Sequence, residues 1–229
     1  MMAGVFVTGT DTGVGKSLAA CALLHAWHAK GARTAGMKPV ASGSEHTPRG
    51  LRNEDALALQ AASSIACGYG QVNPYAFAPP IAPELAAREA GAQVALPVLR
   101  DAFDALSAGA DVVVVEGAGG WMAPFSATLD QCDLARGFGL PVVLVVGLRL
   151  GCVSHARLTA RAIRADGLRL AGWIGSAIDP HMLRREENIE TLRMRIDAPC
   201  WGVLPHVPAA DPRALAAHLS VPAWNAVGR

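Results

Sequence analysis

Three glycines, a lysine and a serine lie close together near the N-terminus, in an order that suits phosphate binding. Gly9, Gly13 and Gly15 allow sharp backbone turns, and Lys16 and Ser17 follow directly. In such a loop the backbone N–H groups cradle phosphate oxygens, the lysine reaches the outer phosphates, and the hydroxyl holds Mg²⁺. We therefore predict that a nucleoside triphosphate is bound here by Gly13, Val14, Gly15, Lys16 and Ser17.

A second lysine and a glutamate each stand at the end of an apolar run typical of a strand. Lys38 follows the run at 33–37, and Glu116 ends the valine-rich run at 111–116. Residues just past the carboxyl ends of parallel strands face the ligand crevice of an open α/β sheet. We therefore expect Lys38 to point at the bound phosphates and Glu116 to bind Mg²⁺. The simpler alternatives are a solvated lysine and an ordinary strand-end glutamate.

Two further features could complete the site. Asn53 is expected to cap a helix, which places Asp55 in its first turn. Asp55 could favour the helix dipole or bind Mg²⁺, and the sequence leaves both open. The glycines at 117, 119 and 120 predict a second anion-binding turn.

Alternating strands and helices are expected to position these groups. Period-2 and apolar runs predict strands at 5–7, 33–37, 111–116, 140–146, 168–174 and 200–204. Helical periodicity predicts helices after Ser17 and Asn53, and near 82–89, 96–107, 156–163, 182–195 and 212–219; 40–53 reads as a loop. We expect one α/β domain over 1–229: a doubly wound, mainly parallel sheet of the P-loop NTPase type, with helices on both faces.

Composition narrows the functional classes. The chain has 229 residues, 52% of them hydrophobic, and a formal net charge of +1, which gives no electrostatic case for nucleic acid or an acidic membrane. The run at 140–146 is too short to span a bilayer, and we see no signal peptide. The five cysteines form no Cys-x-x-Cys pair, which favours reduced thiols and a cytoplasmic location.

Two classes of nucleotide-dependent protein compete at this point. One is a P-loop ATPase switch that binds partners, and the other is a synthetase that activates a small acid with the γ-phosphate. Lysine occurs only at 16, 30 and 38, so the Asn-Lys-x-Asp base motif of GTPases is absent. A partitioning-type ATPase carries a second lysine in the loop, where this chain has Asp11, and that weakens the first class.

Several motifs together resemble dethiobiotin synthetase. They are Gly9-Thr-Asp-Thr-Gly-Val-Gly-Lys-Ser17, Lys38-Pro-Val-Ala-Ser-Gly43, Asn53-Glu-Asp-Ala-Leu57, Val72-Asn-Pro-Tyr75, Glu116-Gly-Ala-Gly-Gly-Trp121 and Val145-Val-Gly-Leu-Arg-Leu-Gly-Cys152. The resemblance reaches to about Pro208. The long spacing from Gly9 to Lys16 is this family's usual form.

The resemblance implies an ATP- and Mg²⁺-dependent cytoplasmic ligase that joins CO₂, or bicarbonate, to 7,8-diaminopelargonic acid and closes a cyclic urea. Lys16 would neutralise phosphate charge, and Lys38 would stabilise a carbamate and the transferring phosphoryl group. The metal ligands would be Ser17, Asp55 and Glu116. Contacts to the diamine or the phosphates would come from Thr12, Ser42, Glu116, Gly117, Ala118 and Gly119.

The resemblance also implies a homodimer and a base-binding region. The substrate's carboxylate end would lie near the stretch 147–154 of the partner subunit, which includes Gly151 and Cys152. The nucleotide base would contact Ser176, Ala177, Pro205, His206 and Val207. Ser176 stands where this family often has asparagine, and Arg149 and Ser154 replace a common lysine and asparagine.

Overall fold

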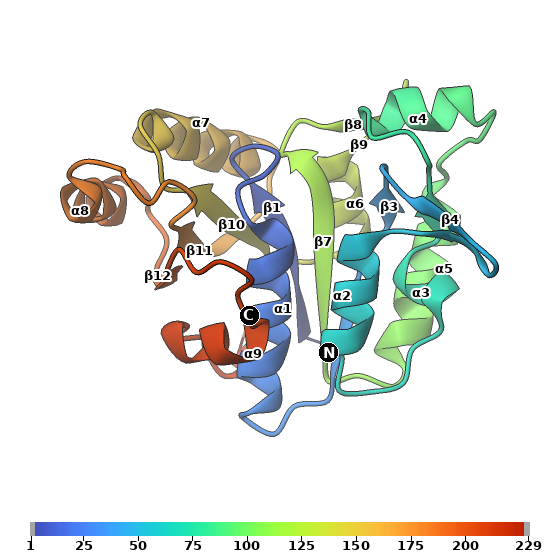
Figure 1. Cartoon of the computed structure of the whole chain (residues 1–229), viewed down its shortest axis with the longest axis horizontal. Helices are drawn as coiled ribbons and strands as arrows, with labels where there is room; N and C mark the ends of the chain where they lie inside the picture. The colour runs from blue at the N-terminus through green and yellow to red at the C-terminus, as the bar shows by residue number, and fades with distance from the viewer. Residues whose placement is uncertain (1–2, 227–229) are drawn as a thin grey trace.

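A sheet of six parallel strands forms the centre of the computed structural model, which describes residues 3–226. The strand order is β12-β11-β10-β1-β7-β2, and every neighbouring pair is parallel. These strands are β1 (Ala3–Gly9), β2 (Thr34–Met37), β7 (Val112–Gly120), β10 (Val142–Gly147), β11 (Leu170–Ser176) and β12 (Cys200–Leu204). The carboxyl ends of β1 and β7 therefore meet at one edge, as Figure 1 shows.

Helices cover both faces of the sheet. The helices are α1 (Lys16–His28), α2 (Glu54–Ala62), α3 (Tyr69–Val72), α4 (Pro83–Glu89), α5 (Leu96–Ser107), α6 (Gln131–Phe138), α7 (Cys152–Ala165), α8 (Arg185–Arg195) and α9 (Pro212–Leu215). Helices α1, α2 and α9 lie in front of the sheet in Figure 1, and α5, α6, α7 and α8 pack into the core on the other face. The predicted doubly wound fold is confirmed.

The valine-rich strand β7 explains why the sheet must be covered on both sides. Val113 and Val115 pack into one hydrophobic core, and Val112 and Val114 pack into the core on the opposite face. All four are fully buried. Alternate side chains of a strand point to opposite faces, so a continuous apolar run requires two layers of helices.

The segment between β2 and α2 is more ordered than the sequence predicts. It was expected to be a loop, but it contains β3 (Val40–Ala41), which pairs with β6 (Tyr75–Ala76), and a hairpin of β4 (Glu45–Thr47) and β5 (Gly50–Arg52). Strands this short carry little periodicity, so the turn residues around them dominate the pattern. A second short pair is β8 (Pro124–Ser126) with β9 (Leu129–Asp130).

The last predicted helix is also shorter than expected. Helix α9 ends at Leu215, and the chain continues as a 3-10 turn over Ala216–His218; a further 3-10 turn covers Trp224–Ala226. Across residues 3–226, no helix combines the length and the hydropathy needed to cross a bilayer.

Candidate active site

The phosphate-binding loop connects β1 to α1 at the carboxyl edge of the sheet. Gly13 and Gly15 have φ of 73° and 84°, a left-handed backbone that side chains rarely allow. Gly15 is the N-cap of α1 and has no side chain to cap the helix, so the N–H groups of its first turn remain available to an anion. Lys16 Nζ donates to the Asp11 carbonyl at 3.0 Å, which folds the lysine over its own loop.

Lys38, at the end of β2, lies in a network of charges that four elements supply. Its Nζ donates to Glu116 Oε1 at 2.6 Å and to Asp55 Oδ2 at 2.9 Å. Ser17, in the first turn of α1, donates its hydroxyl to the same Glu116 oxygen at 2.7 Å. The network therefore joins β2, β7 and the N-termini of α1 and α2 in front of the phosphate loop.

Burial makes these charges unusually dependent on one another. Lys38 is 4% exposed and Glu116 is 1% exposed. Burial opposes the charge of Lys38, but attraction to Glu116 and Asp55 outweighs it, so the pKa of Lys38 lies above its ordinary value. Burial raises the pKa of Glu116, although Lys38 opposes that change. Lys38 is thus held as a cation beside the loop.

The other two titratable groups of the pocket are shifted as well. Burial lowers the pKa of Lys16, and repulsion from Lys38 lowers it further. Burial alone would raise the pKa of Asp55, but attraction to Lys38 and a hydrogen bond from Ser17 lower it below its ordinary value. Two cations and two carboxylates therefore share one pocket, so the charge that an anionic ligand meets depends on how the carboxylates are neutralised.

Ser17, Asp55 and Glu116 form a donor set that suits Mg²⁺. Oε2 of Glu116 is buried and has no hydrogen-bond partner, so an oxygen ligand is available. Asp55 is 42% exposed at its side chain and faces the same cavity. Mg²⁺ takes oxygen ligands and is bound by one or two carboxylates together with substrate phosphates and water. The residues present fit this metal.

One cavity of about 400 Å³ brings together most of the predicted site residues. It is lined by Thr12, Gly13, Gly15, Lys16, Ser17, Leu18, Lys38, Ala41, Ser42, Asp55, Glu116, Ala118 and Gly119. Val14 lies beneath the loop in the hydrophobic core. The Gly117 carbonyl is 3.4 Å from Lys38 Nζ, so this residue also touches the network.

The residues predicted to contact the base lie apart from that cavity, at the ends of β11 and β12. Ala177, Pro205 and His206 line a separate hollow of about 500 Å³. The His206 ring nitrogen Nδ1 is 3.1 Å from the Ala177 carbonyl. Ser176 is buried, and its hydroxyl lies 2.7 Å from the point that a Cβ on Gly15 would occupy. Val207 is half-exposed and lines neither cavity.

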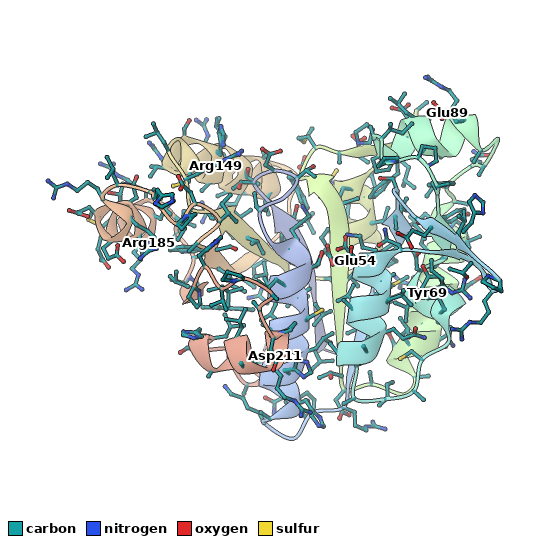
Figure 2. All side chains as sticks on the ribbon, viewed as in Figure 1. Glu54, Tyr69, Glu89, Arg149, Arg185 and Asp211 are labelled. Atoms are coloured by element: carbon teal, nitrogen blue, oxygen red, sulfur yellow. The ribbon has the colours of Figure 1, made fainter. Side chains whose placement is uncertain are left out.

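Gly151 and Cys152, at the start of α7, do not line the cavity either. The Cys152 thiol is buried, and its N–H donates to the Arg149 carbonyl. Arg149 forms an ion pair with Asp11 at 2.6 Å, which ties this segment to the phosphate loop. Figure 2 shows Arg149 on the α7 side of the loop and Glu54 on the α2 side. The role of Gly151 and Cys152 at the substrate site of a partner subunit stays a prediction.

The predicted turn after Glu116 is wrong. Strand β7 continues through Gly117 to Gly120, and only Gly119 has a positive φ, of 64°. The glycines are strand residues because Gly120 still pairs with Gly9 of β1. The predicted helix cap is confirmed, since the Asn53 side chain accepts the Ala56 N–H at 3.2 Å.

Two supporting residues were not predicted. Asn73 donates its side-chain N–H to the Lys38 carbonyl at 2.7 Å, and its place in the Val72-Asn-Pro-Tyr75 motif was the available signal. Gln131 is fully buried and donates to Thr8 and Gly120. Nothing in the sequence around Gln131 distinguishes it from an ordinary first residue of a helix.

The parallel sheet, the phosphate loop and the opposing charged residues define a P-loop nucleotide-binding protein. A family model described as "AAA domain" matches residues 3–214. Solved structures agree on the fold: the MinC:MinD cell division protein complex of Aquifex aeolicus gives a TM-score of 0.54 at 14% identity, covering 90% of this chain and 82% of that one. The cell division protein FtsY of Thermotoga maritima gives 0.50 at 15% identity, covering 97% and 69%.

Curated relatives are far more similar. The ATP-dependent dethiobiotin synthetase BioD of Xanthomonas euvesicatoria pv. vesicatoria is 61% identical over 95% of this chain and 97% of its own length. The protein of the same name from Xylella fastidiosa is 57% identical over 95% and 97%. The chain belongs to the ATP-dependent dethiobiotin synthetase family. The resemblance predicted from the motifs is confirmed, and so is the prediction of an enzyme of this family.

Proposed function

We propose that this single-domain protein makes dethiobiotin from 7,8-diaminopelargonic acid, CO₂ and ATP. Membership of the family supports this function, and one structural observation supports locating the reaction at this cavity. A buried ammonium, Lys38 Nζ, is fixed by Glu116 and Asp55 in the cavity that also contains the phosphate loop. A cation in that place suits an anionic acceptor that must meet the γ-phosphate of ATP.

The reaction divides into three steps. One amine of the substrate attacks CO₂ and loses a proton, which gives an N-carbamate. A carbamate oxygen attacks the γ-phosphorus and ADP leaves, which gives a carbamic-phosphoric anhydride. The second amine attacks the anhydride carbon and loses a proton, and inorganic phosphate leaves, which closes the urea ring. Ring closure is favoured because both amines are on one molecule.

Each charged residue has a role in these steps. Lys16 neutralises the β- and γ-phosphates, with the N–H groups of Gly13 to Ser17 around them. Lys38 stabilises the carbamate and the transferring phosphoryl group, and Thr12, Ser42 and Gly119 border the acceptor. Glu116, Asp55 and Ser17 would hold Mg²⁺, which supplies further neutralisation of phosphate charge when bound. The base would lie against Ser176, Ala177, Pro205, His206 and Val207.

We also propose a cytoplasmic homodimer. The five cysteines are all free thiols, which suits a reducing compartment. Met122, Leu150 and Leu158 are 64%, 93% and 63% exposed, so the α7 side offers apolar area to a second copy. Such a dimer would bring Gly151 and Cys152 toward the partner's acceptor. Sedimentation of the protein with and without Leu158→Glu tests this, because a stable monomer in both cases contradicts it.

One assay tests the reaction. The protein is mixed with ATP, Mg²⁺, ¹³C-bicarbonate and the diamine, and the product is analysed by mass spectrometry. We expect dethiobiotin with one ¹³C, at the urea carbon, and one phosphate released per product. A nucleotide-switched, partner-binding ATPase of the partitioning type would instead hydrolyse ATP without the diamine. Phosphate release that ignores the diamine, with no dethiobiotin, would therefore overturn the proposal.

A further inference from the structure

Strand β7 bulges away from β1 just beyond Glu116. Val7 of β1 pairs with Glu116, and the next paired residues are Gly9 and Gly120. One residue of β1, Thr8, therefore faces the segment 117–119 of β7. A bulge of this kind re-aims nearby groups and leaves part of the ladder unpaired. Glu116 is the last residue of β7 paired with β1 before the bulge, and Gly117 is the first residue within it.

The side chain of Gln131 fills the gap that the bulge opens. Gln131 is the first residue of α6 and is fully buried. Its Nε2 donates to Thr8 Oγ1 and to the Gly120 carbonyl, both at 2.9 Å, so one amide connects the two separated strands. Its backbone N–H donates to the Ala123 carbonyl at 3.1 Å, which fixes the start of the side chain.

The bulge and Gln131 are fitted to one another. A Cβ on Gly117 would lie 2.1 Å from Gln131 Oε1 and 3.0 Å from Phe6 Cε1, so only glycine fits beside this amide. Oε1 itself is buried without a hydrogen-bond partner, which costs free energy. An apolar side chain of similar size would fill the same space without that cost. Packing alone therefore does not explain a glutamine at this position. The amide is explained if its two donated hydrogen bonds, to Thr8 and Gly120, are needed.

We propose that Gln131 is a positioning residue for the reaction. It does not line the cavity at the phosphate loop. It holds the β7 bulge so that the Glu116 carboxylate and the Gly117 carbonyl meet Lys38 Nζ, at 2.6 Å and 3.4 Å. The kinetic consequence rests on the proposed function, whereas the effect on Lys38 does not.

The effect on Lys38 can be observed without any substrate. The chain has only three lysines, Lys16, Lys30 and Lys38, so ¹⁵N spectra of the side-chain ammonium groups are simple to assign. In Gln131→Leu we expect the Lys38 signal to shift or broaden, while the signal of Lys30 stays in place. Gln131→Met is the second variant if the leucine form does not fold. Cys132→Ala, a truncation of the next buried residue of α6, is the control and should leave Lys38 unchanged.

Steady-state kinetics then separate positioning from packing. Small misplacements of reacting groups can cost as much as ~100-fold in rate, so we expect kcat of folded Gln131→Leu to fall about ten- to 100-fold. KM for ATP should change little, and Thr8→Val, which removes one of the two hydrogen bonds, should give a smaller loss. An unchanged Lys38 signal in folded Gln131→Leu, or an equal effect of Cys132→Ala, overturns the positioning role. A wild-type protein that makes no dethiobiotin overturns the proposed function, and the spectra still decide the role of Gln131.

Discussion

The two sides of the phosphate loop differ in what they offer a ligand. On the side of β2, β7 and α2, the carboxylates of buried Glu116 and partly exposed Asp55 lie 2.6 and 2.9 Å from Lys38 Nζ. On the side of β11 and β12, the hollow around Ala177 and His206 is lined by both apolar and charged side chains, among them Arg185 and Glu186. The first side places a lysine and two carboxylates next to the phosphate loop, whereas the second forms a separate hollow. We therefore expect substitutions on the first side to affect chemistry, and those on the second to affect nucleotide affinity.

Lys38→Met should have the largest effect. In the proposed mechanism it removes the ammonium that stabilises the transferring phosphoryl group, and lost electrostatic stabilisation of this kind costs roughly 10²- to 10³-fold in kcat. It also leaves Glu116 buried with the Ser17 hydroxyl but without its charged partner, so the thermal midpoint should fall unless Glu116 takes up a proton. Dethiobiotin formation measures the first effect and calorimetry the second. Lys30→Met is the control, because Lys30 is exposed and its ammonium donates to the Val221 carbonyl, away from the cavity. Near-normal turnover of Lys38→Met would break the contrast between the two sides.

Glu116→Gln should weaken Mg²⁺-dependent ATP binding. The amide keeps the shape of the side chain and removes the charge, and a hydrogen bond or ligand contact to a charged group contributes about 1.5–3 kcal/mol. We expect ATP with Mg²⁺ to bind about ten- to 100-fold more weakly in isothermal titration calorimetry. Binding of ATP in the presence of a chelator should change less. Glu54→Gln, at the exposed residue next to Asp55 in α2, is the matched control. A metal requirement of Glu116→Gln identical to that of the wild type would contradict the role of Glu116 as a Mg²⁺ ligand.

The same contrast explains which parts of the molecule could be predicted from the sequence. Lys38 directly follows β2, and Glu116 directly follows the four buried valines of β7. Parallel strands end at one edge of a sheet, so the convergence of these two residues followed from the fold. The bulge beyond Glu116 could not be predicted, because it depends on Gln131 from a distant helix filling the gap beside Thr8. Four glycine and alanine residues after a strand look like a turn unless that tertiary contact is known.

The hairpin before α2 was missed for a related reason. Strands β4 and β5 are three residues each, and they pair in antiparallel fashion from Glu45 opposite Arg52 to Thr47 opposite Gly50. Strands of this length are too short to produce a recognisable period-2 pattern in the sequence. The base side, meaning the residues at the ends of β11 and β12 that we expect to contact the nucleotide base, was predicted through the family resemblance alone. A backbone carbonyl such as that of Ala177 is present in every residue and cannot be recognised in a sequence, whereas a charged side chain at the end of an apolar run can.

Asp55→Asn should give a smaller, pH-dependent effect on stability. The pKa of Asp55 is lowered in the folded state, so its contribution is fully present above the pKa of the unfolded carboxyl, near 3.8, and is lost as the pH falls through the lowered value. Because the side chain is 42% exposed, we expect at most about 1 kcal/mol. The wild type should melt above the variant at pH 7, and the gap should shrink below about pH 4. Asp101→Asn, on an exposed face of α5, should show no such trend; a gap that widens in acid would contradict the ion pair with Lys38.

Ser176→Asn on the base side should have the smallest effect. Ser176 is buried at the end of β11, and its hydroxyl lies 2.7 Å from the point that a Cβ on Gly15 would occupy, so a longer amide has to be accommodated beside the phosphate loop. One added or lost neutral hydrogen bond changes affinity by about 0.5–1.5 kcal/mol, which is roughly two- to tenfold. We expect KM to change by that factor, differently for ATP and GTP, while kcat stays constant, with the exposed Ser220→Asn as the control. If kcat fell as far as in Lys38→Met, the base side would be coupled to phosphoryl transfer, and the division between the two sides would fail.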